Sequence, residues 1–123
     1  MKLENTPAER IEALAAAQKA RFRSGATLPE KFRRTMLRRF DAALVNWEKR
    51  LCDALWQDLH KSCEEAMLTE LSIVRGEIRH HLRHLRRWMR PESRPTPFKL
   101  LPSKSRILAE PLGQALIVAP WNY

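Results

Sequence analysis

Hydrophobic residues recur every three or four positions through the first ninety residues of the chain, which is the period of an amphipathic α-helix. The first predicted helix has Pro7 at its first helical position and runs to Arg23. Thr6 and Glu9 are placed to form a capping box, and Gly25 can supply a left-handed stop. The pattern therefore predicts that the helical body begins within the first ten residues.

A second helix is expected to start at Pro29, with Asn46 suited to end it and to cap a third helix from Trp47 to about His60. One continuous helix from Pro29 to His60 fits the same pattern and stays open as an alternative. Ser62 and Glu65 form a second capping box, which predicts a fourth helix of about seven turns. The apolar stripe of the second helix comprises Phe32, Met36, Leu37, Phe40, Ala43 and Leu44.

The composition changes at Pro91, which is expected to end the fourth helix because the residue before a proline is disfavoured in the helical region. Four prolines within a dozen residues exclude helix and favour an extended connector. Residues 105–110 have the pattern of a short, partly exposed strand. The sequence therefore divides into a helical layer of about four helices over residues 1–90 and a proline-rich connector and β-arm over residues 91–109.

The last segment, residues 110–123, opens on a turn signal at Pro111 and Gly113 and continues as an apolar run from Ala115 to Ala119. Such a run is typical of a strand buried on both faces inside a parallel sheet. No further strand follows it to pair with. We therefore expect the chain to be the front part of a longer protein, cut just after its first core strand.

Composition and charge restrict the possible partners. The chain is 44% hydrophobic and 30% charged, which is typical of a globular protein, and its net charge of +9 favours an anionic partner. No aromatic residue interleaves with the basic stripe of the fourth helix and no nucleic-acid motif is present, so a solvated face or an acidic partner domain is the preferred interpretation. No secretory signal or membrane-spanning run is visible, which favours the cytoplasm. The basic stripe comprises Arg75, Arg79, Arg83, Arg86, Arg87 and Arg90.

Several other residues could carry chemistry. Cys52 and Cys63 are predicted to be free, buried thiols in a reducing compartment. His80 and His84 have a zinc-compatible spacing, but no third ligand completes a site on that helix, so we expect no metal centre.

The segment Pro120-Trp121-Asn122-Tyr123 follows the predicted parallel strand, where ligands of open α/β sheets bind. A carboxamide placed there can donate hydrogen bonds to a developing oxyanion, an effect worth on the order of 3 kcal/mol of barrier. The flanking aromatic rings can form the wall of a pocket.

Residues 110–123 read Glu-Pro-Leu-Gly at their start and Ala-Pro-Trp-Asn-Tyr at their end, and this pairing resembles the start of the dinucleotide-binding domain of aldehyde dehydrogenases. Phe22-Arg-Ser-Gly25, Asp58-Leu-His-Lys61 and the helix that opens on Glu64-Glu65 follow in the order of the class 3, fatty-aldehyde-type branch. The resemblance spans roughly Ala16 to Tyr123. It implies that the chain is the N-terminal part of an α/β enzyme.

The resemblance also implies an activity. This family oxidises aldehydes to carboxylates with NAD or NADP, through attack of a cysteine thiolate and hydrolysis of the resulting thioester. By resemblance, Asn122 is the side-chain oxyanion donor and Tyr123 faces the aldehyde funnel. Val118, Ala119, Pro120 and Trp121 would line the cofactor site, and the β-arm would cross to a dimer partner.

The family's catalytic cysteine, general-base glutamate and glycine-containing cofactor turn are absent from these 123 residues. We therefore expect the chain alone to be inactive and to bind no cofactor. Two other hypotheses remain: a stand-alone helical interaction or oligomerisation module, and a basic nucleic-acid-binding protein. Binding with a steep dependence on salt would favour the last of these.

Overall fold

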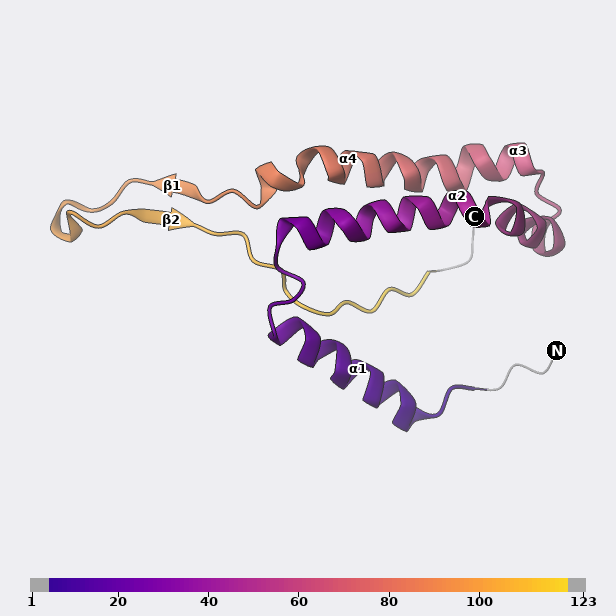
Figure 1. The fold of residues 1–123 in the computed structure, drawn as a ribbon, viewed down its shortest axis with the longest axis horizontal. Helices are drawn as coiled ribbons and strands as arrows, with labels where there is room; N and C mark the ends of the chain where they lie inside the picture. The colour runs from indigo at the N-terminus through magenta and orange to yellow at the C-terminus, as the bar shows by residue number, and fades with distance from the viewer. Residues whose placement is uncertain (1–4, 120–123) are drawn as a thin grey trace. The chain divides into compact units, whose positions relative to one another are not determined.

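The computed structural model describes residues 5–119, which fall into two compact units. One unit spans Glu30–Ala109, and the other contains residues 5–29 and 110–119. The described residues form three long helical segments in place of the four expected, together with a two-stranded sheet (Figure 1). The elements are α1 (Ala8–Arg23), α2 (Glu30–Leu59), α3 (Cys63–Ala66), a π-helical turn (Met67–Leu71), α4 (Ser72–Trp88), β1 (Glu92–Arg94), a 3-10 turn (Phe98–Leu100) and β2 (Ser105–Ile107).

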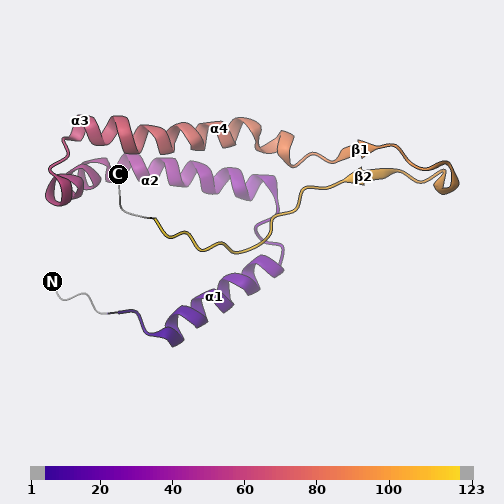
Figure 2. The same cartoon turned by 180° about the vertical axis from the view of Figure 1, so that it is seen from behind.

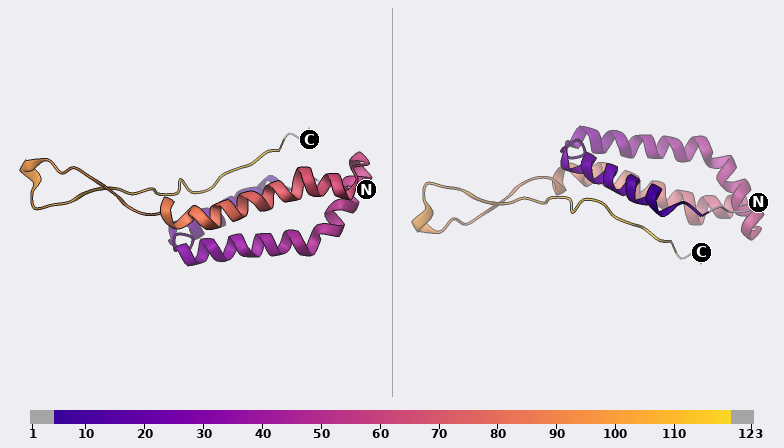
Figure 3. Two further views of the ribbon diagram at one scale, coloured as in Figure 1. Left: turned by 90° about the horizontal axis from the view of Figure 1, so that it is seen from above. Right: turned by 90° about the horizontal axis from the view of Figure 1, so that it is seen from below.

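The larger unit is built on an antiparallel pair of helices, α2 and α4, which lie side by side (Figures 1 and 3). Arg34 on α2 donates a hydrogen bond of 2.7 Å to the carbonyl of Leu82, and Asp41 accepts one of 2.8 Å from Arg75. These links are seven residues apart on both helices. Seven residues make about two helical turns, so both links lie on the same pair of facing surfaces. They fix the register of α2 against α4.

The core of this unit follows the same spacing. The helical turns of residues 63–88 follow one another without a gap and are called the α4 segment below. Leu71, Ile78 and Leu85 are buried and lie seven residues apart along one face of this segment. Cys52 and Ala66 are buried where α2 turns into α3. The apolar period seen in the sequence of this segment therefore marks the packed face, as predicted.

The turn between α2 and α3 is tightly held. His60 adopts a left-handed conformation with φ of 52°. The amide of Lys61 donates a hydrogen bond of 3.4 Å to the carbonyl of Leu55, which is the pattern of a helix C-terminal cap. The Lys61 side chain is only 8% exposed, and its ammonium lies 2.8 Å from a carboxylate oxygen of Glu70. Burial of this charge is tolerated because the carboxylate balances it.

Cys52 and Cys63 are joined by a disulfide in this turn, so the expectation of free thiols is wrong. The sequence places the two residues eleven apart without revealing where the chain turns. Because α2 ends at Leu59 and the chain reverses at once, their Cα atoms come within 5.0 Å of each other, inside the range that a disulfide spans.

Two predicted helix boundaries also differ from the structure. Pro7 occupies the N-cap of α1, with ψ of 140° and no side-chain cap, so the capping box of Thr6 and Glu9 does not form. The helix α2 continues through Asn46 without a break, as the single-helix alternative allowed. The tertiary packing of its apolar stripe outweighs the weak cap preference of one asparagine.

The other predicted helix ends are confirmed. Gly25 has the left-handed φ of 74° expected after α1. The Ser62 hydroxyl accepts a hydrogen bond of 3.2 Å from the Glu65 amide at the start of α3. A π-helical turn connects α3 to α4, and α4 ends at Trp88, just before Pro91.

The proline-rich connector contains more regular structure than predicted. β2 falls within the predicted strand, but it pairs antiparallel with β1, which the sequence did not predict, in a register that matches Glu92 with Ile107 and Arg94 with Ser105. The two strands extend beyond the C-terminal end of α4 (Figure 2). The Ser105 amide also donates to the Thr96 hydroxyl at 2.9 Å. This bond continues the contact between the two chain segments just beyond the paired residues.

No helix in residues 5–119 is long and apolar enough to cross a membrane.

The disulfide predicts a measurable stability difference. Replacement of both cysteines, Cys52→Ser with Cys63→Ser, is expected to lower the free energy of unfolding by about 2–3 kcal/mol, because the link removes loop entropy from the unfolded chain. Urea denaturation at neutral pH measures the change. Dithiothreitol should weaken the wild-type chain by a similar amount and leave the double variant unaffected. Complete alkylation of both cysteines in the native chain without reductant would contradict the link.

The Asp41–Arg75 pair predicts a pH dependence of stability. The hydrogen bond from Arg75 holds the pKa of Asp41 below its usual value, so the pair stabilises the fold above about pH 4 and loses its effect as the pH falls through the lowered pKa. We expect Asp41→Asn to destabilise the chain at neutral pH, and this difference to shrink at acidic pH. Urea midpoints across the pH range test it. Asp53→Asn is the matched control, since its partner Lys49 is 87% exposed and the pair contributes little.

Candidate functional site

The predicted catalytic segment begins in residues 110–119, which form neither a helix nor a strand. The side chains of Leu116, Ile117 and Val118 are 90%, 87% and 78% exposed. The predicted strand from Ala115 to Ala119 is therefore not formed. A strand requires a hydrogen-bonded neighbour, and the described part of the chain supplies none for these residues.

The start of this segment is held against α1, within the same unit. The Gln114 carboxamide donates a hydrogen bond of 2.7 Å to the carbonyl of Ala15 and one of 3.3 Å to the side-chain oxygen of Gln18. Gly113 has φ of 118°, and a β-carbon at this position would lie 3.5 Å from the ring of Phe22. A β-carbon at that distance would make only an ordinary contact, so glycine is needed at this predicted turn for its positive φ.

The six predicted site residues are only partly described. Val118 and Ala119 are neighbours on the exposed apolar run. Pro120, Trp121, Asn122 and Tyr123 lie outside the described residues. The assignments of an oxyanion donor, a cofactor wall and a substrate funnel to these residues stay predictions.

Neither cysteine offers a nucleophile in this structure. Cys52 is 5% exposed, and both sulfur atoms are used in the link between α2 and α3. A thiolate is the reactive form of cysteine, and a disulfide has none.

The histidines of α4 form an aromatic cluster. The ring centroids of His80 and His84 lie 4.2 Å apart, and His84 stacks on Trp88 at 5.7 Å. Nδ1 of His84 lies 2.8 Å from the carbonyl of His80, and Nδ1 of His81 lies 2.9 Å from that of Glu77, so both nitrogens act as donors. Within residues 5–119, no group of three or more histidine, cysteine, aspartate or glutamate side chains is arranged to hold a metal ion.

The basic stripe of α4 divides into two parts. Arg75 binds Asp41 across the helix pair, and this hydrogen bond raises the pKa of the guanidinium. Farther along α4 and just beyond its end, no ion pair within residues 5–119 joins a carboxylate to Arg83, Arg86, Arg87 or Arg90. The sequence correctly indicated the stripe but could not separate its paired from its unpaired members.

The sequence did not reveal a groove of about 330 Å³ between α2 and the α4 segment. Its lining is mostly leucine, with one alanine, one valine and two acidic residues, Asp58 and Glu70. The apolar stripes of both helices were visible in the sequence, but their relative register was not. The lining residues are Leu44, Leu51, Ala54, Leu55, Asp58, Glu70, Leu71 and Val74.

Comparison with known proteins gives a consistent result. The model of the aldehyde dehydrogenase family matches residues 1–123. Aldehyde dehydrogenase family 3 member B1 of Homo sapiens is 41% identical over 102 residues, which cover 83% of this chain and 22% of that protein. The 4,4'-diaponeurosporen-aldehyde dehydrogenase of Staphylococcus aureus is 36% identical over 105 residues, or 85% of this chain and 23% of that protein. The chloroplastic family 3 member I1 of Arabidopsis thaliana is 33% identical over 105 residues, or 85% of this chain and 19% of that protein.

The chain spans about a fifth of the length of these curated relatives. The resemblance seen in the sequence is confirmed, including its class 3 character, because relatives named as family 3 members match over most of the chain. The helical layer, the β-hairpin and the apolar segment described above are therefore parts of a known kind of protein: the chain belongs to the aldehyde dehydrogenase family.

Proposed function

We propose that the protein to which this chain contributes is an NAD(P)-dependent aldehyde dehydrogenase, and that the chain supplies its N-terminal helical layer and one edge of its catalytic site. The substrate would be an aldehyde and the product a carboxylate. The observation that carries the proposal is the family match over all 123 residues. Its support is strengthened by the presence of the Trp-Asn-Tyr sequence at the end of the apolar run.

The exposed apolar run supports a place for residues 115–119 inside a larger sheet. Leu116 and Ile117 alternate across an extended chain and are almost fully exposed, so each face of a strand formed here would be apolar. Strands that are apolar on both faces are found where helices cover both sides of a parallel sheet. A partner strand would satisfy the backbone groups of the run and cover these side chains.

Among the described residues, only Val118 and Ala119 would line the nicotinamide cofactor, and they would form one part of the wall of its site. Val118 is 78% exposed and presents an apolar surface, which suits contact with a ring and a ribose. With Ala119 it would form the described portion of that wall, and Pro120 and Trp121 would continue it. The pyrophosphate would need a glycine-rich turn at a helix N-terminus, which this segment does not contain. When bound, the cofactor accepts a hydride from the substrate carbon.

Asn122 would act on the developing negative charge of the aldehyde oxygen. Its carboxamide nitrogen can donate a hydrogen bond that strengthens as the carbonyl becomes tetrahedral. A carboxamide is neutral, so it can donate this hydrogen bond without itself carrying a charge. Tyr123 would limit access to the same carbon from the substrate side.

The β-hairpin supports assembly into a homodimer. Each strand pairs along one edge, so the outer edges of β1 and β2 are available for pairing with another chain. A cytoplasmic location is part of the proposal.

A second candidate function, a helical interaction module, is favoured by one observation. Large apolar side chains remain exposed on α2 and on the α3–α4 segment, including Trp47, Trp56, Leu59, Leu68 and Ile73, which are each more than half exposed. Such a surface favours association with another protein surface. This property is equally expected of a helical layer that covers another domain of the same enzyme.

The proposed role of Asn122 predicts a loss of turnover in the whole enzyme. Asn122→Ala is expected to lower kcat by about 10²–10³-fold with a smaller effect on KM, because the lost hydrogen bond acts mainly in the transition state. Steady-state kinetics with a fatty or aromatic aldehyde measures it. The matched control is Asn46→Ala, which removes the same carboxamide from the middle of α2 and should leave kcat within about twofold.

A kcat for Asn122→Ala close to that of the unchanged enzyme would overturn the assignment. The 123 residues by themselves are proposed to be inactive, because a hydrogen-bond donor without a nucleophile cannot form the covalent intermediate. Aldehyde turnover by the purified 123-residue chain would contradict this part of the proposal.

A further inference from the structure

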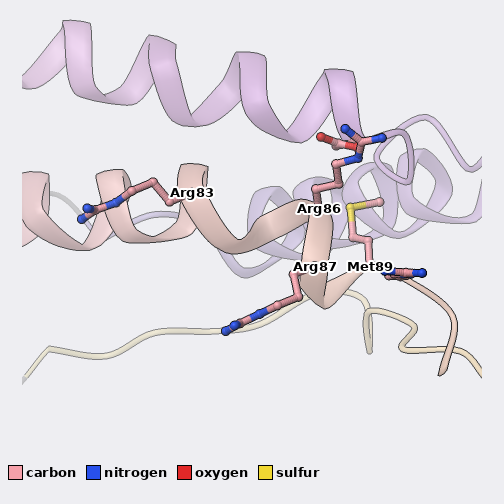
Figure 4. A pocket seen from close by; sticks show the side chains of 6 residues that line it. Arg83, Arg86, Arg87 and Met89 are labelled. Atoms are coloured by element: carbon pink, nitrogen blue, oxygen red, sulfur yellow. The ribbon is translucent and has the colours of Figure 1, made fainter.

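A hollow of about 700 Å³ lies at the C-terminal end of α4, beside the first residue of α2. Figure 4 shows Arg86 extending from α4 toward the start of α2, whereas Arg83 and Arg87 extend away from Met89. Four arginines and one carboxylate supply all its charged lining groups. The lining residues are Glu30, Arg83, Arg86, Arg87, Met89 and Arg90.

The positive charge of this hollow is poorly balanced within the described chain. Glu30 is the only acidic residue of the lining, and its carboxylate lies 3.9 Å from Arg34, outside the hollow. No ion pair within residues 5–119 engages the four lining arginines, and all four are exposed. This differs from Arg75 on the same helix, which Asp41 neutralises at 2.8 Å. The excess positive charge is therefore concentrated at one end of the helix pair.

The frame of the hollow is fixed by contacts that do not use these arginines. Arg34 donates to the carbonyl of Leu82 at 2.7 Å, which holds the start of α2 beside the last turns of α4. Leu85 is buried between the positions of Arg83 and Arg87 and anchors that turn to the core. The end of α4 is closed by the Met89 amide, which donates to the carbonyl of Leu85 at 3.0 Å. The backbone that carries these arginines is therefore held in place by other contacts.

We propose that this hollow is a binding site for a phosphate-bearing anion. Guanidinium groups are planar and present paired donors that match phosphate oxygens, and the four that line this hollow come from adjacent turns at the end of α4. The volume lies within the range of small-molecule sites and accommodates a diphosphate or a phospholipid headgroup. The carbonyls at the C-terminal end of α4 carry partial negative charge, so attraction must come from the side chains.

Two probes test the site with the full chain. Isothermal titration with pyrophosphate measures binding of a soluble anion. Co-sedimentation with phosphatidylcholine vesicles, with and without phosphatidic acid, measures binding of a phosphate-bearing headgroup. The test variant is Arg83→Gln with Arg87→Gln, and the matched control is Arg38→Gln with Arg39→Gln, which makes the same charge change at exposed positions of α2 outside the hollow.

We expect the Arg83/Arg87 variant to bind the responding probe about tenfold more weakly or worse, and the Arg38/Arg39 variant to change its affinity by less than about twofold. Response to pyrophosphate identifies a soluble source of the phosphate, and response only to phosphatidic acid vesicles identifies a lipid source. Failure of both probes to bind, or equal weakening by both double variants, overturns the site. Circular dichroism confirms that the exposed substitutions leave the helix content unchanged. The test is independent of aldehyde turnover, so its result does not depend on the proposed enzyme activity.

Discussion

The register of α2 against α4 is the constraint on which the larger unit depends. It is set by two cross-helix contacts, Arg34 to the Leu82 carbonyl and Asp41 to Arg75, which recur at the same seven-residue interval on both helices. With this register, the α4 segment turns its apolar face inward and the apolar groove opens in the half of the pair nearer the α2–α3 turn. Four arginines gather beside Glu30 at the opposite end of the pair. A shift of one residue on either helix would separate the links and turn each face by about 100°.

The turn between α2 and α3 holds the other end of the pair. A left-handed residue at His60 reverses the chain, the buried ammonium of Lys61 binds Glu70, and a disulfide joins the two helices across the turn. These contacts make the turn rigid without a large core. Few apolar side chains are buried among the described residues, and much apolar surface of the helical pair is exposed.

Local sequence signals predicted much of this fold because they act over one or two turns of the chain. Gly25, the Ser62 cap and Pro91 each determine their own surroundings. The apolar stripe of the α4 segment predicted its packed face, whereas Phe40 and Ala43 of the stripe predicted for the second helix are exposed. The break at Asn46 was wrong because packing along the helix outweighed a local preference. The disulfide, the pairing of β1 with β2 and the arginine-lined hollow depend on how distant segments meet, which periodicity does not encode. The strand predicted over residues 115–119 is not formed, because pairing needs a neighbouring strand that the described residues do not supply. The predicted roles of the residues that follow it stay predictions.

The structure divides the described chain into a packed helical layer, a β-hairpin and an exposed apolar segment that forms no regular element. Hydrogen exchange followed by mass spectrometry tests this division most directly, because it measures each segment of the purified 123-residue chain separately. The account predicts slow exchange along the facing surfaces of α2 and α4 and around the Lys61 turn, and exchange at the rate of an unstructured peptide over residues 115–119. Strong protection of residues 115–119, or rapid exchange throughout α4, would contradict it.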